Sequence, residues 1–206
     1  ELADCLPGVF ERVGGAMELL LPQGLMMSDG VVGKLNTILA DEDWRKGVTV
    51  LGWMYQYYNA DVKDEFFKAK RKAAAADIAP ATQLFTPEWI VRYMVQNSLG
   101  RLWMLNNPGS SLREHMEYYI EPDAEHEDFI RISSPEEITL CDPACGSGHI
   151  LVYAFELLFH MYEERGYRER EIPELILTKN IAGMEIDSRA AQIAELALAM
   201  LSLIHI

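Results

Sequence analysis

The residues best suited to chemistry lie between Cys141 and Leu151, which read CDPACGSGHIL. The acid Asp142 ends an apolar run, and two glycines, Gly146 and Gly148, follow before a helical pattern begins. Glycines let the backbone approach a ligand closely, and a helix N-terminus offers free N–H groups. Because ligands bind at the carboxyl ends of strands in open α/β sheets, this segment is a candidate binding loop.

The absence of two known phosphate-binding motifs and the presence of Asp142 indicate the kind of ligand. A dinucleotide fingerprint needs a third glycine where Leu151 stands. The phosphate loop G-x-x-x-x-G-K-[ST] is absent, and GVVGKL around Lys34 has the wrong spacing. Asp142 would repel a diphosphate but could pair with an ammonium group, which favours a cofactor that carries an amino acid.

A second group of acids, Glu185 and Asp187, ends the next apolar run, NIAGMEID. A carboxylate there can accept both hydroxyl groups of a ribose, and we favour Glu185 for this role. A glycine loop with a strand-ending acid, followed by a ribose-binding acid, describes recognition of S-adenosylmethionine. Cys141, Cys145 and His149 have a spacing that could suit a metal, but no fourth ligand is evident, so no metal is expected.

Alternating strands and helices must position these acids. Residues 138–201 contain the apolar runs EITLCD and NIAGMEID, each followed by a helical pattern, which predicts parallel strands joined by right-handed crossovers. The first helix follows Gly148 and ends near Gly166, and the second covers SRAAQIAELALAML. The last residues, LSLIHI, are expected to break that helix, and the chain is expected to end within an incomplete fold.

A helix is also predicted over residues 86–105, ahead of the loop. Thr86-Pro87-Glu88 is a strong start signal, with Thr86 as the N-cap. The apolar face of this helix consists of Ile90, Val91, Met94, Val95, Leu99 and Leu102. Residues 110–137 are acidic and weakly periodic, which predicts a surface insertion with one short helix.

Residues 1–83 read as a mostly helical region, with helices near residues 31–40 and 48–59. The aromatic side chains of the second helix are expected to pack in the core: Trp53, Tyr55, Tyr57 and Tyr58. Five cations lie close together downstream: Lys63, Lys68, Lys70, Arg71 and Lys72. They form either a solvated surface or a patch that faces phosphates.

Composition limits the function further. The 206 residues carry 18 bases and 32 acids, a net charge of −14. This balance disfavours nucleic-acid binding, but residues 113–137 hold much of the excess, so a basic face elsewhere is not excluded. The chain has no apolar run of membrane-spanning length and no basic signal segment, and its three cysteines form no disulfide framework. We therefore expect a cytoplasmic protein without membrane contacts.

Three motifs, in this order, resemble one family. DPACGSGHIL is similar to the first cofactor motif, D-P-x-x-G-x-G, of amino-methylating DNA methyltransferases. FTPEWIVRYMV resembles the Thr-Pro helix of the adenine-N6 subgroup, and GMEID resembles the second cofactor motif. Across residues 45–200 the chain is similar to adenine-specific methyltransferases of the BREX and phage-growth-limitation defence systems.

The resemblance implies an α/β fold: part of a class I, Rossmann-like S-adenosylmethionine-dependent methyltransferase, from residue 84, preceded by the helical region. It implies site-specific methyl transfer to the N6 amine of adenine in double-stranded DNA, in a phage-defence or restriction-modification context, with other phage-defence proteins as further partners. It places Thr86 at the methionine end of the cofactor, although a plain N-cap role is equally open for this residue. Glu185 would hold the ribose and Ile186 would pack against the adenine. The methionine and sugar would be lined by Asp142, Pro143, Ala144, Gly146 and Gly148.

The family's catalytic tetrapeptide, Asn/Asp-Pro-Pro-Tyr/Phe, does not occur in these residues. It holds the amine of the extruded adenine and stacks on the base. We expect this motif and the DNA-recognition domain beyond the last residue, so that the chain alone would be inactive and prone to associate. Two alternatives remain open: a methyltransferase acting on a protein or a small molecule, and a non-catalytic module that binds a cofactor or nucleic acid.

Overall fold

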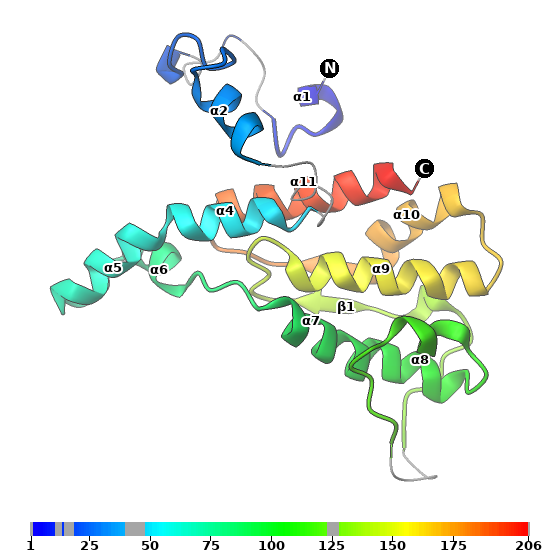
Figure 1. The fold of residues 1–206 in the computed structure, drawn as a ribbon. Coiled ribbons are helices and arrows are strands. Elements are labelled where there is room, and N and C mark those ends of the chain that lie inside the picture. The colour runs from blue at the N-terminus through cyan, green and yellow to red at the C-terminus, as the bar shows by residue number, and fades with distance from the viewer. Residues whose placement is uncertain (1, 11–13, 15–18, 40–47, 123–127, 206) are drawn as a thin grey trace.

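Helices dominate the structure, and the part of the chain that it describes contains two short strands (Figure 1). The computed structural model describes residues 2–10, 14, 19–39, 48–122 and 128–205. The α-helices are α1 (Leu2–Cys5), α2 (Val31–Ile38), α4 (Val50–Tyr58), α5 (Ala60–Ala69), α6 (Ala75–Thr82), α7 (Glu88–Val95), α8 (Arg101–Asn106), α9 (His149–Glu164), α10 (Ile172–Leu175) and α11 (Ser188–Ile204). The 3₁₀ turns are η3 (Ser111–His115), η4 (Pro135–Glu137) and η5 (Glu169–Glu171), the π turns are η2 (Gln96–Gly100) and η6 (Ile176–Asn180), and the strands are β1 (Leu140–Asp142) and β2 (Ile181–Gly183).

Helix α9 is the centre of the core. A helix that is apolar on all sides belongs in a protein interior, and from Leu151 to Tyr162 only Glu156 and His160 are more than marginally exposed. Helices α7 and α11 both pack against it, and Figure 1 shows α9 running between them. The position of the glycine loop that precedes α9 is therefore fixed by the core itself.

The two strands form a parallel pair, with Leu140 opposite Ile181 and Asp142 opposite Gly183. The order strand–helix–strand–helix agrees with the expectation from the sequence. Each strand is only three residues long, shorter than the apolar runs that predicted them. The first run begins at the end of the turn η4, so β1 starts late in it. The strand β2 starts directly after the π turn η6, at the second residue of its run, and ends early, at Gly183.

Helix α11 continues through the apolar residues at its end, so the predicted break within LSLIHI is wrong. Leu201 is buried in the core, whereas Leu203 and Ile204 are 69% exposed. An apolar run without glycine or proline carries no stop signal, and one buried position per turn is enough to keep the helix against its neighbours.

The predicted helix ahead of the loop is one continuous helical segment formed by α7, η2 and α8. Val91, Val95 and Leu99 are buried as predicted, but the start of the helix and one position of the apolar face differ from the prediction. Pro87, not Thr86, is the N-cap, and its carbonyl accepts hydrogen bonds from the N–H groups of Ile90 and Val91. The π turn inserts an extra residue and rotates the face of the positions that follow it, among them Trp103. Met94, expected in the core, is 48% exposed, while Trp103 is fully buried.

The acidic segment 110–137 is not simply a surface insertion, so that prediction is corrected in part. Leu112, Met116 and Tyr119 are buried in the main core. The side chain of Asn97 binds the segment's backbone on both sides, donating to the carbonyl of Tyr118 and accepting from Ile120 N–H, each at 2.8 Å. The prediction was based on the acidic residues, which are mostly exposed where the structure describes them, and did not consider the buried apolar residues between them.

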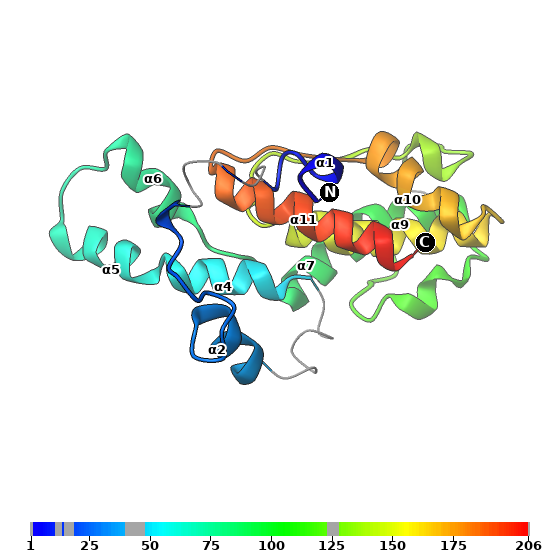
Figure 2. The ribbon, with the colours of Figure 1, turned by 90° about the horizontal axis from the view of Figure 1, so that it is seen from above.

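The N-terminal helices lie over α11 and extend beyond it. Helix α4 packs against α11, and α5 and α6 form a hairpin that projects from the rest of the molecule (Figure 2). The prediction that Tyr57 and Tyr58 pack in the core is wrong, because these side chains are 75% and 69% exposed. Helix α4 packs through the side that carries Gly52, and the two tyrosines keep their hydroxyl groups in water.

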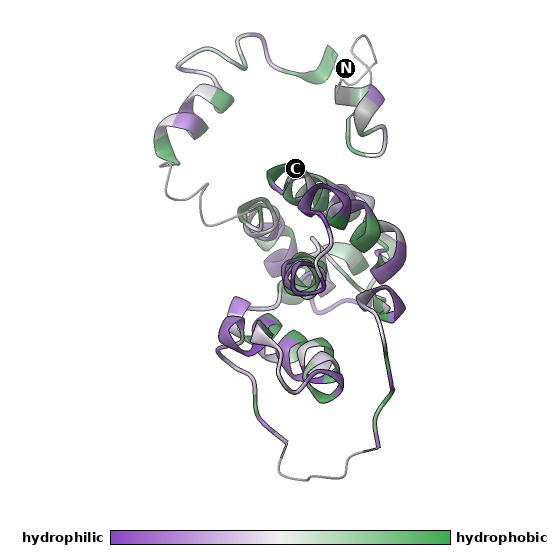
Figure 3. Ribbon diagram, turned by 90° about the vertical axis from the view of Figure 1, so that its right-hand side faces the viewer, coloured by the Kyte–Doolittle hydropathy of each residue, from purple (hydrophilic) through white to green (hydrophobic). Residues whose placement is uncertain are grey.

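Hydrophilic and hydrophobic residues are mixed along the helices (Figure 3). Among the described residues, no helix combines the length and apolarity that a membrane crossing requires. The chain after α1 contacts α11 at Gly8, whose carbonyl oxygen accepts a hydrogen bond from Gln192 Nε2 at 3.1 Å.

Gly148 gives a test of how the loop is held between α9 and α11. Its φ is +83°, and a Cβ built there would lie 2.9 Å from Ala194 Cβ. Gly166, with φ +77°, has open space around it and serves as a matched control. We expect Gly166→Ala to lower the free energy of unfolding by about 1–2 kcal/mol through the backbone alone. Gly148→Ala should lose roughly 1–3 kcal/mol more through overpacking, as measured by urea unfolding. Equal losses would show that Ala194 adjusts freely.

Candidate cofactor-binding site

The glycine loop and the segment after β2 lie side by side at the carboxyl ends of the strands. Met184 N–H donates to the carbonyl of Asp142 at 2.9 Å, and Cys145 N–H donates to the carbonyl of Met184 at 3.0 Å. These bonds continue the pairing beyond β1 and β2. Gly148 N–H then donates to the carbonyl of Cys145 at 2.8 Å, which turns the chain into α9.

Glu185 joins the two predicted motifs directly. Its Oε2 accepts a hydrogen bond from Gly146 N–H at 2.7 Å, and its Oε1 accepts one from Asp187 N–H at 3.0 Å. Asp142 plays a local role, since its Oδ1 accepts from Ala144 N–H at 3.1 Å. A carboxylate has about four acceptor directions, so both acids retain capacity for a ligand.

A small cavity of about 40 Å³ lies beside this loop. Its walls are formed by Leu84, Phe85, Thr86, Asp142, Ala144, Cys145, Gly146, His149 and Ile150. The fold therefore brings Thr86 to the same cavity as Asp142, Ala144 and Gly146. The volume suits one or two water-sized groups, so a nucleoside would have to extend outside it.

The remaining residues predicted to contact the cofactor are not in the walls of this cavity: Pro143, Gly148, Glu185 and Ile186. Pro143 is exposed, and Ile186 is 79% exposed beyond the end of β2. Glu185 reaches the cavity through its bond to Gly146. Gly148 is buried, and the contact that requires a glycine there is with Ala194 of α11, so ligand approach is not needed to explain this residue.

Thr86 is positioned by the N-terminal helices. Phe85 N–H donates to Gln56 Oε1 of α4 at 2.8 Å, and the Phe85 ring lies 5.3 Å from the His149 ring, centroid to centroid. A Cβ at Gly146 would lie 3.2 Å from that phenyl ring. A glycine is therefore favoured at position 146 for two reasons: the backbone has a φ of +55°, and a side chain there would crowd Phe85.

Asp187, named with Glu185 as a candidate for the ribose, has a structural role that was not predicted. Its Oδ1 accepts from Arg189 N–H at 3.1 Å and caps α11, while its Oδ2 accepts from Tyr55 Oη at 2.7 Å and from Gln83 Nε2. Gln83 in turn accepts a hydrogen bond from Asn59 Nδ2 at 2.5 Å. The acid-Ser start of α11 was visible as a capping signal, but nothing in the sequence points to partners more than a hundred residues away.

The cysteines and histidine of the loop do not form a nucleophile or a metal centre. Burial, followed by the nearby carboxylates of Asp142 and Glu185, raises the pKa of Cys145 to about 11, which keeps the thiol protonated at neutral pH. Burial lowers the pKa of His149, opposed by backbone groups of Thr86 and Thr49. Within the described ranges, no three His, Cys, Asp or Glu side chains are grouped to hold a metal ion.

Comparison with known proteins gives this geometry a context. Residues 130–204 match the family model described as the MmeI DNA-methyltransferase domain. The chain is 47% identical to the adenine-specific methyltransferase BrxX of Escherichia coli O9:H4 (strain HS) over 210 residues, which cover 98% of this chain and 17% of that protein. It is 40% identical to the adenine-specific methyltransferase PglX of Lacticaseibacillus casei (strain Zhang) over 212 residues, 95% of this chain and 17% of that protein.

A more distant similarity, 26% over 133 residues, links 55% of the chain to 11% of a putative type II restriction enzyme and methyltransferase of Methanocaldococcus jannaschii. The chain thus spans about a sixth of the length of the BrxX and PglX relatives. These matches confirm the resemblance inferred from the three motifs. The chain belongs to the family of adenine-specific methyltransferases that includes BrxX and PglX.

Proposed function

We propose that this chain supplies the S-adenosylmethionine-binding part of an enzyme that methylates the N6 amine of adenine in DNA, in a phage-defence system. The observation that carries the proposal is the hydrogen bond between Glu185 and Gly146, which joins the two cofactor motifs, beside a cavity shared with Thr86. The names of the relatives, adenine-specific methyltransferases, support the choice of substrate.

The residues present fit this cofactor. Glu185 keeps acceptor capacity for ribose hydroxyl groups, and the exposed side chain of Ile186 offers an apolar surface to an adenine ring. Asp142 is suited to the ammonium of the methionine end, with Thr86 across the same cavity. Pro143, Ala144, Gly146 and Gly148 would line the remainder. On this proposal residues 84–206 are the first part of a class I, Rossmann-like domain.

The bound cofactor supplies an electrophilic methyl group, and the task of this chain's residues is to hold it in place. Asp142 and Glu185 bind opposite ends of the ligand, and the Asp187 network keeps the N-terminal helices against the loop. We assign no catalytic role to any residue here, because the tetrapeptide that holds the target amine is not in this sequence. The chemistry is a direct transfer that depends on positioning rather than on a covalent enzyme intermediate.

Cofactor binding is tested by removing one acceptor. In Glu185→Gln the amide cannot accept hydrogen bonds with its nitrogen, so the loop and the ribose compete for one oxygen. We expect affinity for S-adenosylhomocysteine to fall about 10- to 100-fold, equivalent to roughly 1–3 kcal/mol, by isothermal titration calorimetry. Glu174→Gln, at an exposed position away from the loop, should change nothing, and NAD should not bind to either protein. Unchanged affinity in Glu185→Gln would remove the ribose assignment.

DNA contact is tested at the tip of the α5–α6 hairpin. Lys68, Lys70 and Lys72 are exposed there, and in the described part of the chain they make no ion pair, whereas Arg71 pairs with Asp77. If they face phosphates, the triple Lys→Ala variant should bind duplex DNA more weakly. The slope of log K against log salt should then fall by about 2–3, since each contact contributes about 0.9.

The control for this experiment removes three cations elsewhere: Lys34, Arg168 and Lys179. Both triple variants lose three positive charges, so the net charge changes equally, and the control leaves the hairpin cations in place. Arg168 and Lys179 already pair with Glu171 and Glu136. An identical salt slope in both triple variants would identify the hairpin cations as a solvated surface.

A further inference from the structure

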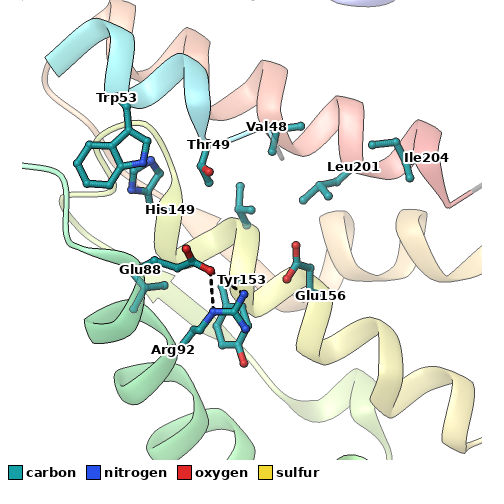
Figure 4. A pocket seen from close by; sticks show the side chains of 12 residues that line it. Val48, Thr49, Trp53, Glu88, Arg92, His149, Tyr153, Glu156, Leu201 and Ile204 are labelled. Atoms are coloured by element: carbon teal, nitrogen blue, oxygen red, sulfur yellow. Dashed lines mark hydrogen bonds and ion pairs between the residues drawn. The ribbon is translucent and has the colours of Figure 1, made fainter. Parts of the chain in front are cut away.

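A second, larger cavity shares His149 with the cavity beside the glycine loop. Its volume is about 170 Å³, and helices α4, α7, α9 and α11 contribute its walls (Figure 4). The apolar walls are Val48, Val91, Val152, Leu201 and Ile204. The polar and aromatic walls are Thr49, Trp53, Glu88, Arg92, His149, Tyr153 and Glu156. Of the three motifs, the glycine loop contributes only His149 to the walls, and the Thr-Pro helix contributes residues from the start of α7.

The charges in this cavity do not balance. Glu88 and Arg92 form an ion pair at 2.7 Å, one turn apart on α7 (Figure 4). Glu156 makes no hydrogen bond with any described residue, and its pKa is raised by burial. His160, the other basic group near Glu156, bonds to Glu163 at 3.0 Å. The positive charges of Arg92 and His160 act in the opposite direction on the pKa of Glu156, but neither group forms an ion pair or a hydrogen bond with it. Of the three charged groups that line the cavity, two are acids and one is a base, so the carboxylate of Glu156 is left without a paired cation among the described residues.

His149 adds a second unsatisfied group. Its side chain is 8% exposed, and its Nε2 atom has no hydrogen-bond partner among the described residues. Its ring lies between those of Trp53 and Phe85, at 5.4 and 5.3 Å between centroids. Because its pKa is lowered, the imidazole is neutral and does not offset Glu156. Buried polar groups are normally satisfied by protein, water or ligand.

We infer that this cavity is a binding site for a small organic cation. An N–H group of the ligand would pair with Glu156, and its apolar body would contact Val152 and Leu201. The Trp53 ring at one end offers a π face to positive charge. A cavity of about 150 Å³ accommodates benzene, so a six-membered ring with one substituent fits the available volume. The site is separate from the proposed cofactor position, although His149 borders both.

The test uses two probes of the same size that differ in charge. 4-Aminopyridine is a planar cation at neutral pH, whereas aniline has the same number of heavy atoms and is neutral. We expect the chain to bind 4-aminopyridine at least tenfold more tightly than aniline, measured by NMR titration. The indole N–H signal of Trp53 and the methyl signals of Val152 and Leu201 should shift on binding.

Glu156→Gln should bind the two probes with about equal affinity, because the amide keeps the size of the side chain but not its charge. Glu174→Gln, on the surface and outside the cavity, should retain the preference and controls for net charge. Thermal unfolding followed by circular dichroism checks that both variants fold. Because Glu156 makes no hydrogen bond in the described structure, little destabilisation is expected.

Three results would overturn the inference: equal affinity for the two probes, a preference that survives in Glu156→Gln, or displacement of 4-aminopyridine by S-adenosylhomocysteine. Displacement would place the cavity within the cofactor site. If S-adenosylhomocysteine does not bind at all while the probes behave as expected, the proposed function fails and the cation site stands.

Discussion

The carboxylate of Asp187 is the interaction on which the arrangement of the site depends. One oxygen caps α11, and the other accepts hydrogen bonds from Tyr55 of α4 and from Gln83 just after α6. A single side chain thus ties the N-terminal helices to the unit that carries the cofactor motifs. Residues 84–86 follow Gln83 directly, so this tie also sets where Thr86 lies against the glycine loop.

Close packing of small residues completes this constraint. A Cβ on Gly52 of α4 would come within 2.2 Å of Ser147 Oγ, and one on Gly148 would come within 2.9 Å of Ala194 Cβ. The loop is therefore held from two sides, by α4 and by α11, at positions where a methyl group does not fit. A rigid support of this kind favours a site in which the protein contributes by positioning a ligand.

Features that depend on neighbouring residues were predicted from the sequence, whereas contacts between residues far apart in the chain were not. The acid-glycine loop, the second acidic cluster and the helices after them follow from residue type and spacing, and the structure places them together. The start of α7 was misassigned by one residue because Thr86 and Pro87 both suit a helix start, and only the hydrogen bonds of Pro87 decide between them. The exposure of Tyr57 depends on which side of α4 meets the core, and no pattern within α4 reveals that. The segment around Met116 was read from its acids, although its apolar residues are what anchor it.

The acidity of the chain is compatible with the proposed function once charge is considered by location. Asp142, Glu185 and Asp187 gather at the carboxyl ends of the strands, and the first two help to raise the pKa of Cys145. A negative potential at this point favours a ligand that carries an ammonium and a sulfonium group, and it disfavours phosphate. DNA contacts made by this chain would therefore have to come from another surface, and the hairpin formed by α5 and α6 carries exposed cations well away from the loop (Figure 1). A net charge of −14 is therefore compatible with the proposed function, because the acids at the cofactor loop and the exposed cations of the hairpin lie in separate places.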